Sequence, residues 1–354
     1  MKNIFRIIAF TLILSLLMPG SVFCDTVDSI VAESVVGSWY GQYTGNHNDI
    51  YVERYMNMTI ESIDDNGNFT EVAYVPTVEG QGYDYEYFNY KFEGKFDFST
   101  NEFFMQGTKL MEHNSSTNWT MIPFDGSLYY TDSGELNVSG IADNNPEKEF
   151  LFARVSDWAK QEVTDANARG LIPESIKGKD LSKPITRAEF AAVSVQLYET
   201  LTGEEAEIVS IPFIDTLGSI DEDYIKKAYG LNIAIGTSDK LFEPDIAINR
   251  EQLVTMLCRT IKKFKYDEWT IDTDSQYILD YSGVTKFADD ENISDFAKPS
   301  VYYMVKMGII SGIDTTHFAP KNYTDEQEAE GYATATREQA IALSLRIYNA
   351  SDNF

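Results

Sequence analysis

The sequence predicts two unlike folded parts: an antiparallel β-barrel or sandwich, followed by an all-α region built from helical repeats. Three observations support this prediction. Residues from about 36 to 155 are rich in Tyr, Phe, Thr and Asn and carry a turn signal about every ten residues. From Ser156 onward, apolar residues recur at the i, i+3/i+4 and i+7 spacing of amphipathic helices. One helix-start motif then appears three times in the helical part, which indicates internal repeats.

The first residues have the pattern of a signal peptide. Lys2 and Arg6 precede an apolar run over 7–18, which is shorter than the roughly 20 residues that a membrane-spanning helix needs. We expect cleavage after Cys24 and find no later apolar stretch long enough to span a membrane. Because no Pro/Ser-rich linker follows the β part, the two folded parts should lie directly against each other. The expected organisation is a signal peptide over 1–24, a β domain over 34–155 and a helical domain over 156–354, with repeats at about 156–203, 211–265 and 285–350.

Turn and strand patterns predict about eight or nine short strands in the β domain. Residues 65–68 (Asp-Asn-Gly-Asn) predict a hairpin turn. Segment 83–96 alternates aromatic and polar residues, so one face should be apolar, and its tyrosines either pack against the fold or stack on sugars. The first strand opens with residues 36–39 (Val-Gly-Ser-Trp), which resemble the Gly-x-Trp start of lipocalin-like barrels. That resemblance implies an internal ligand cavity, whereas Trp39 taken alone is a core residue.

The repeated helix start has the pattern of a capping box. Residues 185–190, 248–253 and 335–340 each place a Thr or Asn cap three positions before a Glu or Gln, so that the two side chains satisfy each other's free amides. The first helical position is always arginine, although the helix dipole disfavours a cation there by about 0.3–1 kcal/mol. We interpret these arginines either as forks for a carboxylate or phosphate, or as partners of acids in a neighbouring repeat. They are Arg187, Arg250 and Arg337.

A second shared element precedes the last two boxes. Residues 236–244 (Gly-Thr-Ser-Asp-Lys-Leu-Phe-Glu-Pro) match residues 312–320 (Gly-Ile-Asp-Thr-Thr-His-Phe-Ala-Pro). We expect the glycine to permit a left-handed turn, the aspartate (Asp239 or Asp314) to bond to the loop backbone, and the phenylalanine to enter the core.

Together these motifs resemble the S-layer homology domain, which usually occurs as three consecutive repeats near one end of exported proteins, mostly of Gram-positive bacteria. The resemblance covers about residues 156–349 and rests on Asp-Trp-Ala at 157–159, Gly-Ile-Ile-Ser-Gly at 308–312, Phe-x-Pro and the Thr-Arg-Ala-Glu box. It implies a pseudo-threefold spindle of helix–loop–helix units, with grooves that bind secondary cell wall polysaccharide bearing pyruvate ketals. It also implies that the box arginines meet the pyruvate carboxylate. The residues implied to bind the glycan are Arg187, Arg250, Arg337, Trp158, Gly236 and Gly312.

Two departures from the family pattern put individual grooves in doubt. The first repeat lacks the glycine-to-proline loop, and its residues 173–184 read Pro-Glu-Ser-Ile-Lys-Gly-Lys-Asp-Leu-Ser-Lys-Pro instead. In the third repeat, an acidic insert over 321–335 separates the loop from its box and could cover or reshape a groove. We therefore expect that three repeats need not give three working sites.

Composition narrows the range of functions expected of the chain. A net charge of −28 disfavours nucleic acid and anionic membranes as partners. The three histidines lie far apart, no metal, cofactor or nucleophile–base motif is readable, and Cys258 falls at an apolar helix position typical of a core residue. The expected function is that of a non-catalytic secreted protein held on the cell wall of a Gram-positive bacterium, whose β domain contacts a small ligand, a sugar or another surface protein. The alternatives are a wall-anchored hydrolase with catalytic acids in the β domain, and an architectural surface-layer component.

Overall fold

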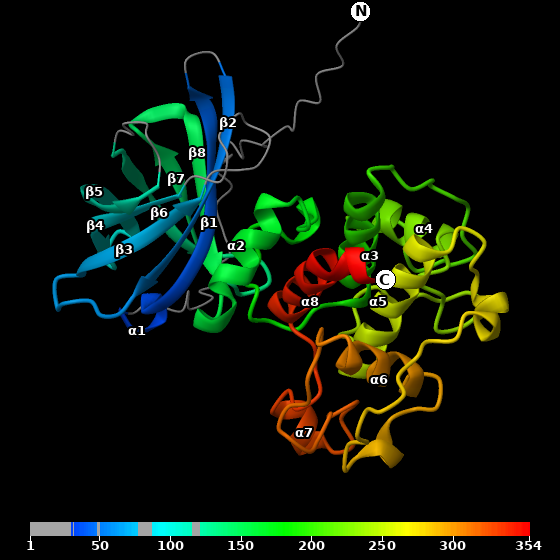
Figure 1. The fold of residues 1–354 in the computed structure, drawn as a ribbon. Helices are drawn as coiled ribbons and strands as arrows, with labels where there is room; N and C mark the ends of the chain where they lie inside the picture. Colours follow the sequence, from blue (N-terminus) through cyan, green and yellow to red (C-terminus); the bar gives the residue numbers. More distant parts are fainter. Residues whose placement is uncertain (1–29, 31, 48–49, 77–86, 115–120) are drawn as a thin grey trace, which may run out of the picture.

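The computed structural model describes residues 30, 32–47, 50–76, 87–114 and 121–354, which form a β part and a helical part (Figure 1). The predicted signal peptide lies outside the described residues, as do Tyr83 and Tyr85 of the aromatic stripe. Among the described helices, none has the length and apolar character needed to cross a membrane.

Within the described residues, eight antiparallel strands form a closed barrel in which neighbours in sequence are neighbours in space. The first strand closes the barrel against the last, with Trp39 opposite Arg154. The sequence is compatible with a barrel or a sandwich, and the structure shows a barrel. A short helix, α1 (Ala32–Val35), precedes the strands, which are β1 (Gly37–His47), β2 (Ile50–Ile60), β3 (Asn68–Pro76), β4 (Tyr87–Asp97), β5 (Glu102–His113), β6 (Pro123–Tyr130), β7 (Leu136–Ala142) and β8 (Asn145–Arg154).

Local patterns in the β part fold as the sequence predicts. The turn at residues 65–67 joins β2 to β3, and Gly67 has a φ of 81°. A Cβ at this position would lie 2.0 Å from the carbonyl oxygen of Phe96, so only glycine fits. Burial alternates along the first half of β4, as the period of two requires. Tyr90 from the aromatic stripe belongs to the buried set inside the barrel, so it packs in the core and presents no sugar-stacking face.

The barrel interior is packed with large side chains. Trp39 is fully buried and its indole Nε1 donates to the carbonyl oxygen of Val35 at 2.9 Å, as expected of a core residue. Aromatic rings pack against one another through the centre, where the resemblance to lipocalin-like barrels implies a ligand cavity. The largest fully buried side chains of the barrel are Trp39, Phe96, Phe103, Phe124, Phe152, Met56, Met58 and Ile60.

The three predicted capping boxes are confirmed. Each box helix begins at its arginine, and in each the cap side chain and the third helical residue exchange hydrogen bonds with the opposite backbone amides. The box helices are α3 (Arg187–Thr202), α5 (Arg250–Lys265) and α8 (Arg337–Ala350). The other helices are η1 (Asp157–Ala159), α2 (Lys160–Ala168), η2 (Glu174–Ile176), α4 (Glu222–Gly230), η3 (Ile271–Gln276), η4 (Asp290–Asn292), α6 (Lys298–Lys306), α7 (Asp325–Ala329) and η5 (Ser351–Asn353).

The three box starts contact one another in a closed ring. Isolated β-bridges pair Thr186 with Ala247, Asn249 with Thr334, and Thr336 with Pro184. Each box arginine also donates its backbone N–H to a loop of another repeat: Arg187 to Ile246, Arg250 to Ala333 and Arg337 to Lys183.

The barrel and the helices lie directly against each other, as the missing linker predicts. Helix α2 lies between the barrel and the remaining helices in Figure 1, where it contacts β1 and β2. Tyr40 and Tyr55 of the barrel belong to the apolar core of the helical part. The buried amide of Asn57 donates to the hydroxyl of Thr164 in α2 at 2.7 Å, which satisfies both groups.

Candidate functional site

Arg187 of α3 holds its guanidinium over a loop of the second repeat. Its Nε donates to the carbonyl oxygen of Phe242 at 2.9 Å, and its Nη2 donates to that of Ile235 at 2.8 Å. The guanidinium carbon lies 4.8 Å from the centre of the Phe242 ring. Burial lowers the pKa of Arg187, with Glu243 and Asp215 opposing that effect. The side chain is thus fixed by carbonyls and a ring, while within the described residues its charge forms no direct ion pair.

Arg250 of α5 repeats this arrangement in the third repeat. Its Nε donates to the carbonyl oxygen of Phe318 at 3.0 Å, its Nη2 donates to that of Ser311 at 2.9 Å, and its guanidinium carbon lies 4.9 Å from the Phe318 ring centre. Burial lowers the pKa of Arg250 to about 10, with a weaker opposing effect from Asp289. A pKa lowered by burial marks a cation that the protein itself does not fully neutralise.

Two aspartates hold the loops that carry these contacts. Asp215 accepts from the backbone N–H of Phe242 at 3.0 Å and of Glu243 at 2.8 Å. Asp289 accepts from the N–H of Phe318 at 2.9 Å and of Ala319 at 2.8 Å. Both phenylalanines are fully buried, which confirms that they enter the core.

The predicted reason for the loop glycines is wrong. Neither Gly236 nor Gly312 is among the described glycines with a positive φ. They are needed because a Cβ would have no room: at Gly236 it would lie 2.4 Å from both the Phe213 ring and the carbonyl oxygen of Ser238, and at Gly312 2.3 Å from that of His317. The left-handed residues of these loops are Glu243, with a φ of 58°, and Ala319, with a φ of 57°.

The expectation for the loop aspartate holds in one repeat. Asp314 accepts from the backbone N–H of Thr316 at 2.6 Å and of His317 at 2.7 Å. In the second repeat that place in the loop is taken by Ser238, whose hydroxyl accepts from the N–H of Leu241 at 3.2 Å. Asp239, the expected counterpart, is one position too late for this contact.

A pocket of about 130 Å³ opens beside Arg250, between α5, α8 and the third loop. It brings together three of the residues predicted from sequence, one from each repeat or its loop, with polar residues that were not predicted. Its principal polar and aromatic lining residues are Trp158, Arg250, Ser311, Gly312, Gln339 and Arg346. Trp158 is about half exposed, at 51%, so the face of its indole is open to a ligand.

Sequence reasoning missed a second arginine in this pocket. Arg346 of α8 donates to the carbonyl oxygen of Ile309 at 3.2 Å and binds the carboxylate of Glu162 through Nε and Nη2. Arg259 of α5 makes the corresponding bond to the carbonyl oxygen of Ile233 at 3.3 Å, and the charge of Arg187 helps burial to lower its pKa. Arg187 and Arg259 therefore share one environment, as Arg250 and Arg346 share the other.

The aligned boxes contain a spacing that indicates Arg259 and Arg346. Arg259 follows Arg250 at the same spacing as Arg346 follows Arg337, and Gln196 takes that position after Arg187. Gln196 donates to the carbonyl oxygen of Gly170 at 2.8 Å, so it occupies the corresponding place without a charge.

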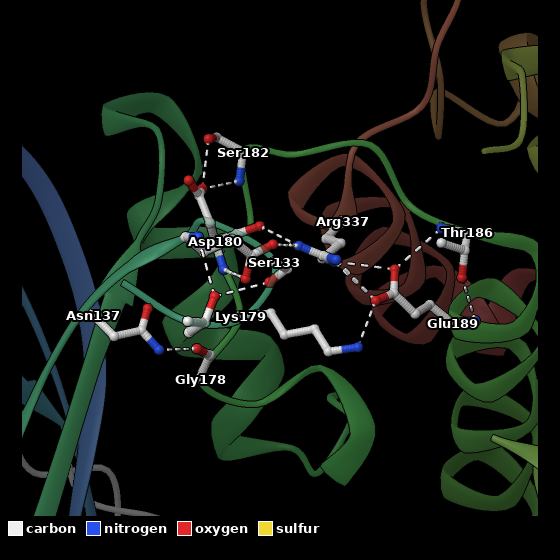
Figure 2. A network of polar contacts seen from close by, with 11 residues as sticks. Ser133, Asn137, Gly178, Lys179, Asp180, Ser182, Thr186, Glu189 and Arg337 are labelled. Carbon is white, nitrogen blue, oxygen red and sulfur yellow. Dashed lines mark hydrogen bonds and ion pairs between the residues drawn. The ribbon is translucent and has the colours of Figure 1, made fainter. Parts of the chain in front are cut away.

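Arg337 lies in a different environment from the other two box arginines. Its guanidinium binds both carboxylate oxygens of Glu189, at 3.0–3.1 Å (Figure 2). It also binds one carboxylate oxygen of Glu135 at 2.6 Å. Burial acts to lower the pKa of Arg337, but the bonds to Glu189 and Glu135 outweigh it and raise the pKa. Of the two sequence interpretations, carboxylate fork and partner of an internal acid, Arg337 fits the second.

Trp158 has a counterpart that the sequence comparison did not include. Residues 156–160 (Ser-Asp-Trp-Ala-Lys) match residues 294–298 (Ser-Asp-Phe-Ala-Lys), and both serines donate their backbone N–H to a buried glutamate of a box helix. Phe296 thus corresponds to Trp158, and it is likewise exposed, at 60%.

Other candidate chemistry finds little support in the described part of the chain. Cys258 is buried and burial raises the pKa of its thiol to about 12, as expected of a core residue and not of a nucleophile. Among the described residues, no group of three or more His, Cys, Asp or Glu side chains is placed to hold a metal ion.

Two segments of the chain, residues 214–254 and 286–330, match the family model of the S-layer homology domain. The helical part of the chain therefore contains S-layer homology domains, matched in two of the three predicted repeats. The two S-layer homology segments contain the Gly236 and Gly312 loops with their anchoring aspartates, and the first segment also contains Arg250.

The chain is also similar to parts of much longer proteins. It is 27% identical over 226 residues to the Exoglucanase XynX of Acetivibrio thermocellus, covering 62% of this chain and 18% of that protein. It is 28% identical over 213 residues to the Amylopullulanase of Thermoanaerobacterium thermosulfurigenes, covering 58% and 10%, and 26% identical over 136 residues to the Endoglucanase of Bacillus sp. (strain KSM-635), covering 36% and 14%. This chain thus spans less than a fifth of the length of each of these relatives.

Proposed function

We propose that this protein is held non-covalently on a bacterial cell wall by S-layer homology repeats that bind an anionic secondary cell wall polysaccharide. The observation that carries the proposal is the pocket in which Arg250 and Arg346 approach the same space beside the exposed ring of Trp158. Guanidinium groups bind carboxylates through paired hydrogen bonds, and an indole face packs on the apolar face of a sugar ring. An acidic sugar chain presents both features together.

The groove beside Arg187, the Arg187 groove, is built from residues of the same kinds as the pocket beside Arg250. Arg187 and Arg259 share it, Gly236 leaves room for the Phe213 ring in its loop, and Phe296 is the counterpart of Trp158. The closed ring of contacts between the box starts supports a pseudo-threefold spindle, in which each groove lies between neighbouring repeats. We infer that these two grooves bind the glycan in the same way.

We propose a pyruvate ketal as the recognised group. Its single carboxylate is fixed to the sugar ring, so the guanidinium of Arg250 can bind the carboxylate while an aromatic face packs on the ring. Arg346, held in place by Glu162, adds positive charge beside it. Secretion and residence on the wall of a Gram-positive bacterium belong to the same proposal, because such a ligand is met only outside the cell.

For the barrel we propose a role as the displayed part, with contacts on its outer face. Large side chains are buried in the described part of its interior, whereas a hollow of about 370 Å³ lies against β4, β5 and β6, beside the exposed Phe104. The three relatives are named as enzymes, but they extend far beyond the matched segments, and we assign no catalysis to this barrel. The hydrolase and surface-layer alternatives predict glycan cleavage and self-assembly of the purified protein, respectively.

Sedimentation of the full chain with purified cell walls tests the proposal. Arg187→Ala and Arg250→Ala should each weaken binding by about 1.5–3 kcal/mol per groove, or tenfold or more, because each removes charge-assisted bonds to the glycan. Lys265→Ala is the matched control, since it removes one positive charge from the exposed far end of α5. Wall binding by the Arg187→Ala/Arg250→Ala double variant at the level of the control would overturn the proposal.

A further inference from the structure

The loop of the first repeat is held by a residue of the barrel. In the second and third repeats, Asp215 and Asp289 accept backbone N–H groups of the loops that face Arg187 and Arg250. The corresponding loop of the first repeat includes Asp180, whose carbonyl oxygen accepts from Arg337 at 2.8 Å. The backbone N–H of Asp180 donates to a carboxylate oxygen of Glu135 at 3.1 Å. Glu135, in the turn before β7, therefore does for this loop what an aspartate of the same repeat does for the others.

The same loop fits closely against the barrel wall. The amide of Asn137 donates to the carbonyl oxygen of Gly178 at 2.7 Å, as Figure 2 shows, and the N–H of Leu181 donates to the carbonyl oxygen of Arg154 at 2.9 Å. A Cβ at Gly178 would lie 2.3 Å from the side chain of Leu151, and Gly178 has a φ of 75°. Residues 173–184, which depart from the family loop, thus contact the barrel surface through these groups.

The carboxylates of this joint occupy the guanidinium of Arg337 on two sides. Glu135 binds it from the barrel and Glu189 binds it from α3. Lys179 binds Glu189 at 2.7 Å (Figure 2), so two cations face the two carboxylates. The side chains of Arg337, Glu135 and Glu189 are 10%, 8% and 4% exposed, so solvent and ligands have little access to the pairs. Gln196 stands here at the position that Arg259 and Arg346 take in the other two grooves, so this groove lacks the charge that they supply.

We propose that the barrel completes the first repeat through Glu135 and thereby takes the Arg337 groove out of ligand binding, so that the chain binds two glycan carboxylates and not three. This inference rests on the proposed function for its count of sites. The barrel and the repeats then form one unit, in which the joint fixes the direction that the barrel faces relative to the wall polymer.

Calorimetric titration of the full chain with a methyl hexoside carrying a pyruvate ketal tests the count. We expect two equivalents bound by the wild-type chain, one by either Arg187→Ala or Arg250→Ala, and none by the double variant. Three equivalents in the wild type, or one remaining in the double variant, would overturn the inference. This design leaves Arg337 untouched, so a folding defect there cannot imitate the result. A wild-type chain that binds no probe contradicts the proposed function together with the count.

Amide hydrogen exchange tests the joint without any ligand. Glu135→Ala should accelerate exchange of the Asp180 amide by about tenfold or more, because that N–H loses its buried acceptor. Glu149→Ala, which removes an exposed carboxylate from β8, is the matched control and should leave this amide unchanged. Equal protection in Glu135→Ala and the control would contradict the completion of the first repeat by the barrel, whatever the titration gives.

Discussion

Glu135 Oε1 lies 2.6 Å from Nη1 of Arg337, although the two residues are 202 positions apart in the chain. Glu135 belongs to the barrel and Arg337 begins the last box helix, so this pair joins the β part to the helical part. Arg250 occupies the same helix position as Arg337 but faces a pocket and carbonyl oxygens instead of carboxylates. Identical local sequence signals thus place arginines in two different roles.

Acid should weaken the joint through Glu189. Burial acts to raise the pKa of Glu189, but Arg337 and Lys179 hold it below its ordinary value of 4.5. A lowered carboxyl pKa contributes stability that is fully present above the unfolded pKa and is lost as the pH falls through the folded pKa. We expect the free energy of unfolding to fall below about pH 4.5, and Glu189→Gln to reduce that dependence. Urea unfolding at several pH values measures the free energy of unfolding, with the variant of the exposed Glu204, Glu204→Gln, as control. If the free energy of unfolding of Glu189→Gln changed with pH as much as that of the wild type, the prediction would be refuted.

Glu71 should make stability depend on pH in the opposite direction, with stability lost as the pH rises. It is buried at the barrel wall, where it accepts from the N–H of Thr59 at 2.9 Å, and burial raises its pKa to about 7. Between its ordinary value and 7 the unfolded chain carries the charge while the folded chain prefers the proton, so stability is lost as the pH rises. Glu71→Gln should therefore stabilise the protein at pH 8 by about 1–2 kcal/mol relative to wild type, and much less at pH 4. Thermal unfolding at both pH values, beside Glu147→Gln, measures the difference; equal effects at both would contradict the prediction.

Replacing Arg259, which lies beside Arg187, should disable the Arg187 groove. Arg259→Gln gives the Arg187 groove the residue that the Arg337 groove has naturally in Gln196. We expect about tenfold weaker binding in that groove, because the charge-assisted bond of the guanidinium is lost and the shorter amide carries no charge. The reverse change, Gln196→Arg, should create no site, since Arg337 stays neutralised by its two glutamates. A titration that shows a new equivalent in Gln196→Arg would argue against that explanation.

A side chain at Gly312 should displace the third loop. The added Cβ would meet backbone oxygens of His317 and Asp314, at 2.3 and 2.6 Å, which cannot move without moving the loop. We expect Gly312→Ala to cost about 1–3 kcal/mol of folding stability and to abolish binding in the Arg250 groove. Thr315→Ala changes an exposed residue of the same loop that does not line the pocket, and it serves as the neighbouring control. Full affinity in Gly312→Ala would mean that the loop is not part of the site.

Local features of this fold are readable from sequence because they depend on neighbours in the chain. The box helices begin where Thr186, Asn249 and Thr336 predict, since a cap and its third helical residue interact within one turn. The turn at Gly67 and the alternation in β4 follow from equally short-range rules.

Contacts between distant segments are not readable in this way. The approach of Trp158 to Arg250 depends on how the starts of the three box helices contact one another. The role of Glu135 depends on a barrel whose position no box encodes. Even the glycines were expected for the wrong reason, because the crowding at Gly236 and Gly312 arises from a folded loop and a buried ring, not from φ. The spacing of Arg259 and Arg346 was available in the repeat alignment, but its meaning appears only when the helices are placed side by side.

The most direct test of the central claim is the affinity of the full chain for purified cell walls before and after removal of pyruvate ketals from their polysaccharide. The arginine grooves predict saturable binding to native walls and a loss of at least tenfold once the carboxylates are gone. Equal affinity for both preparations would contradict the claim that Arg187 and Arg250 recognise a carboxylate of the wall glycan.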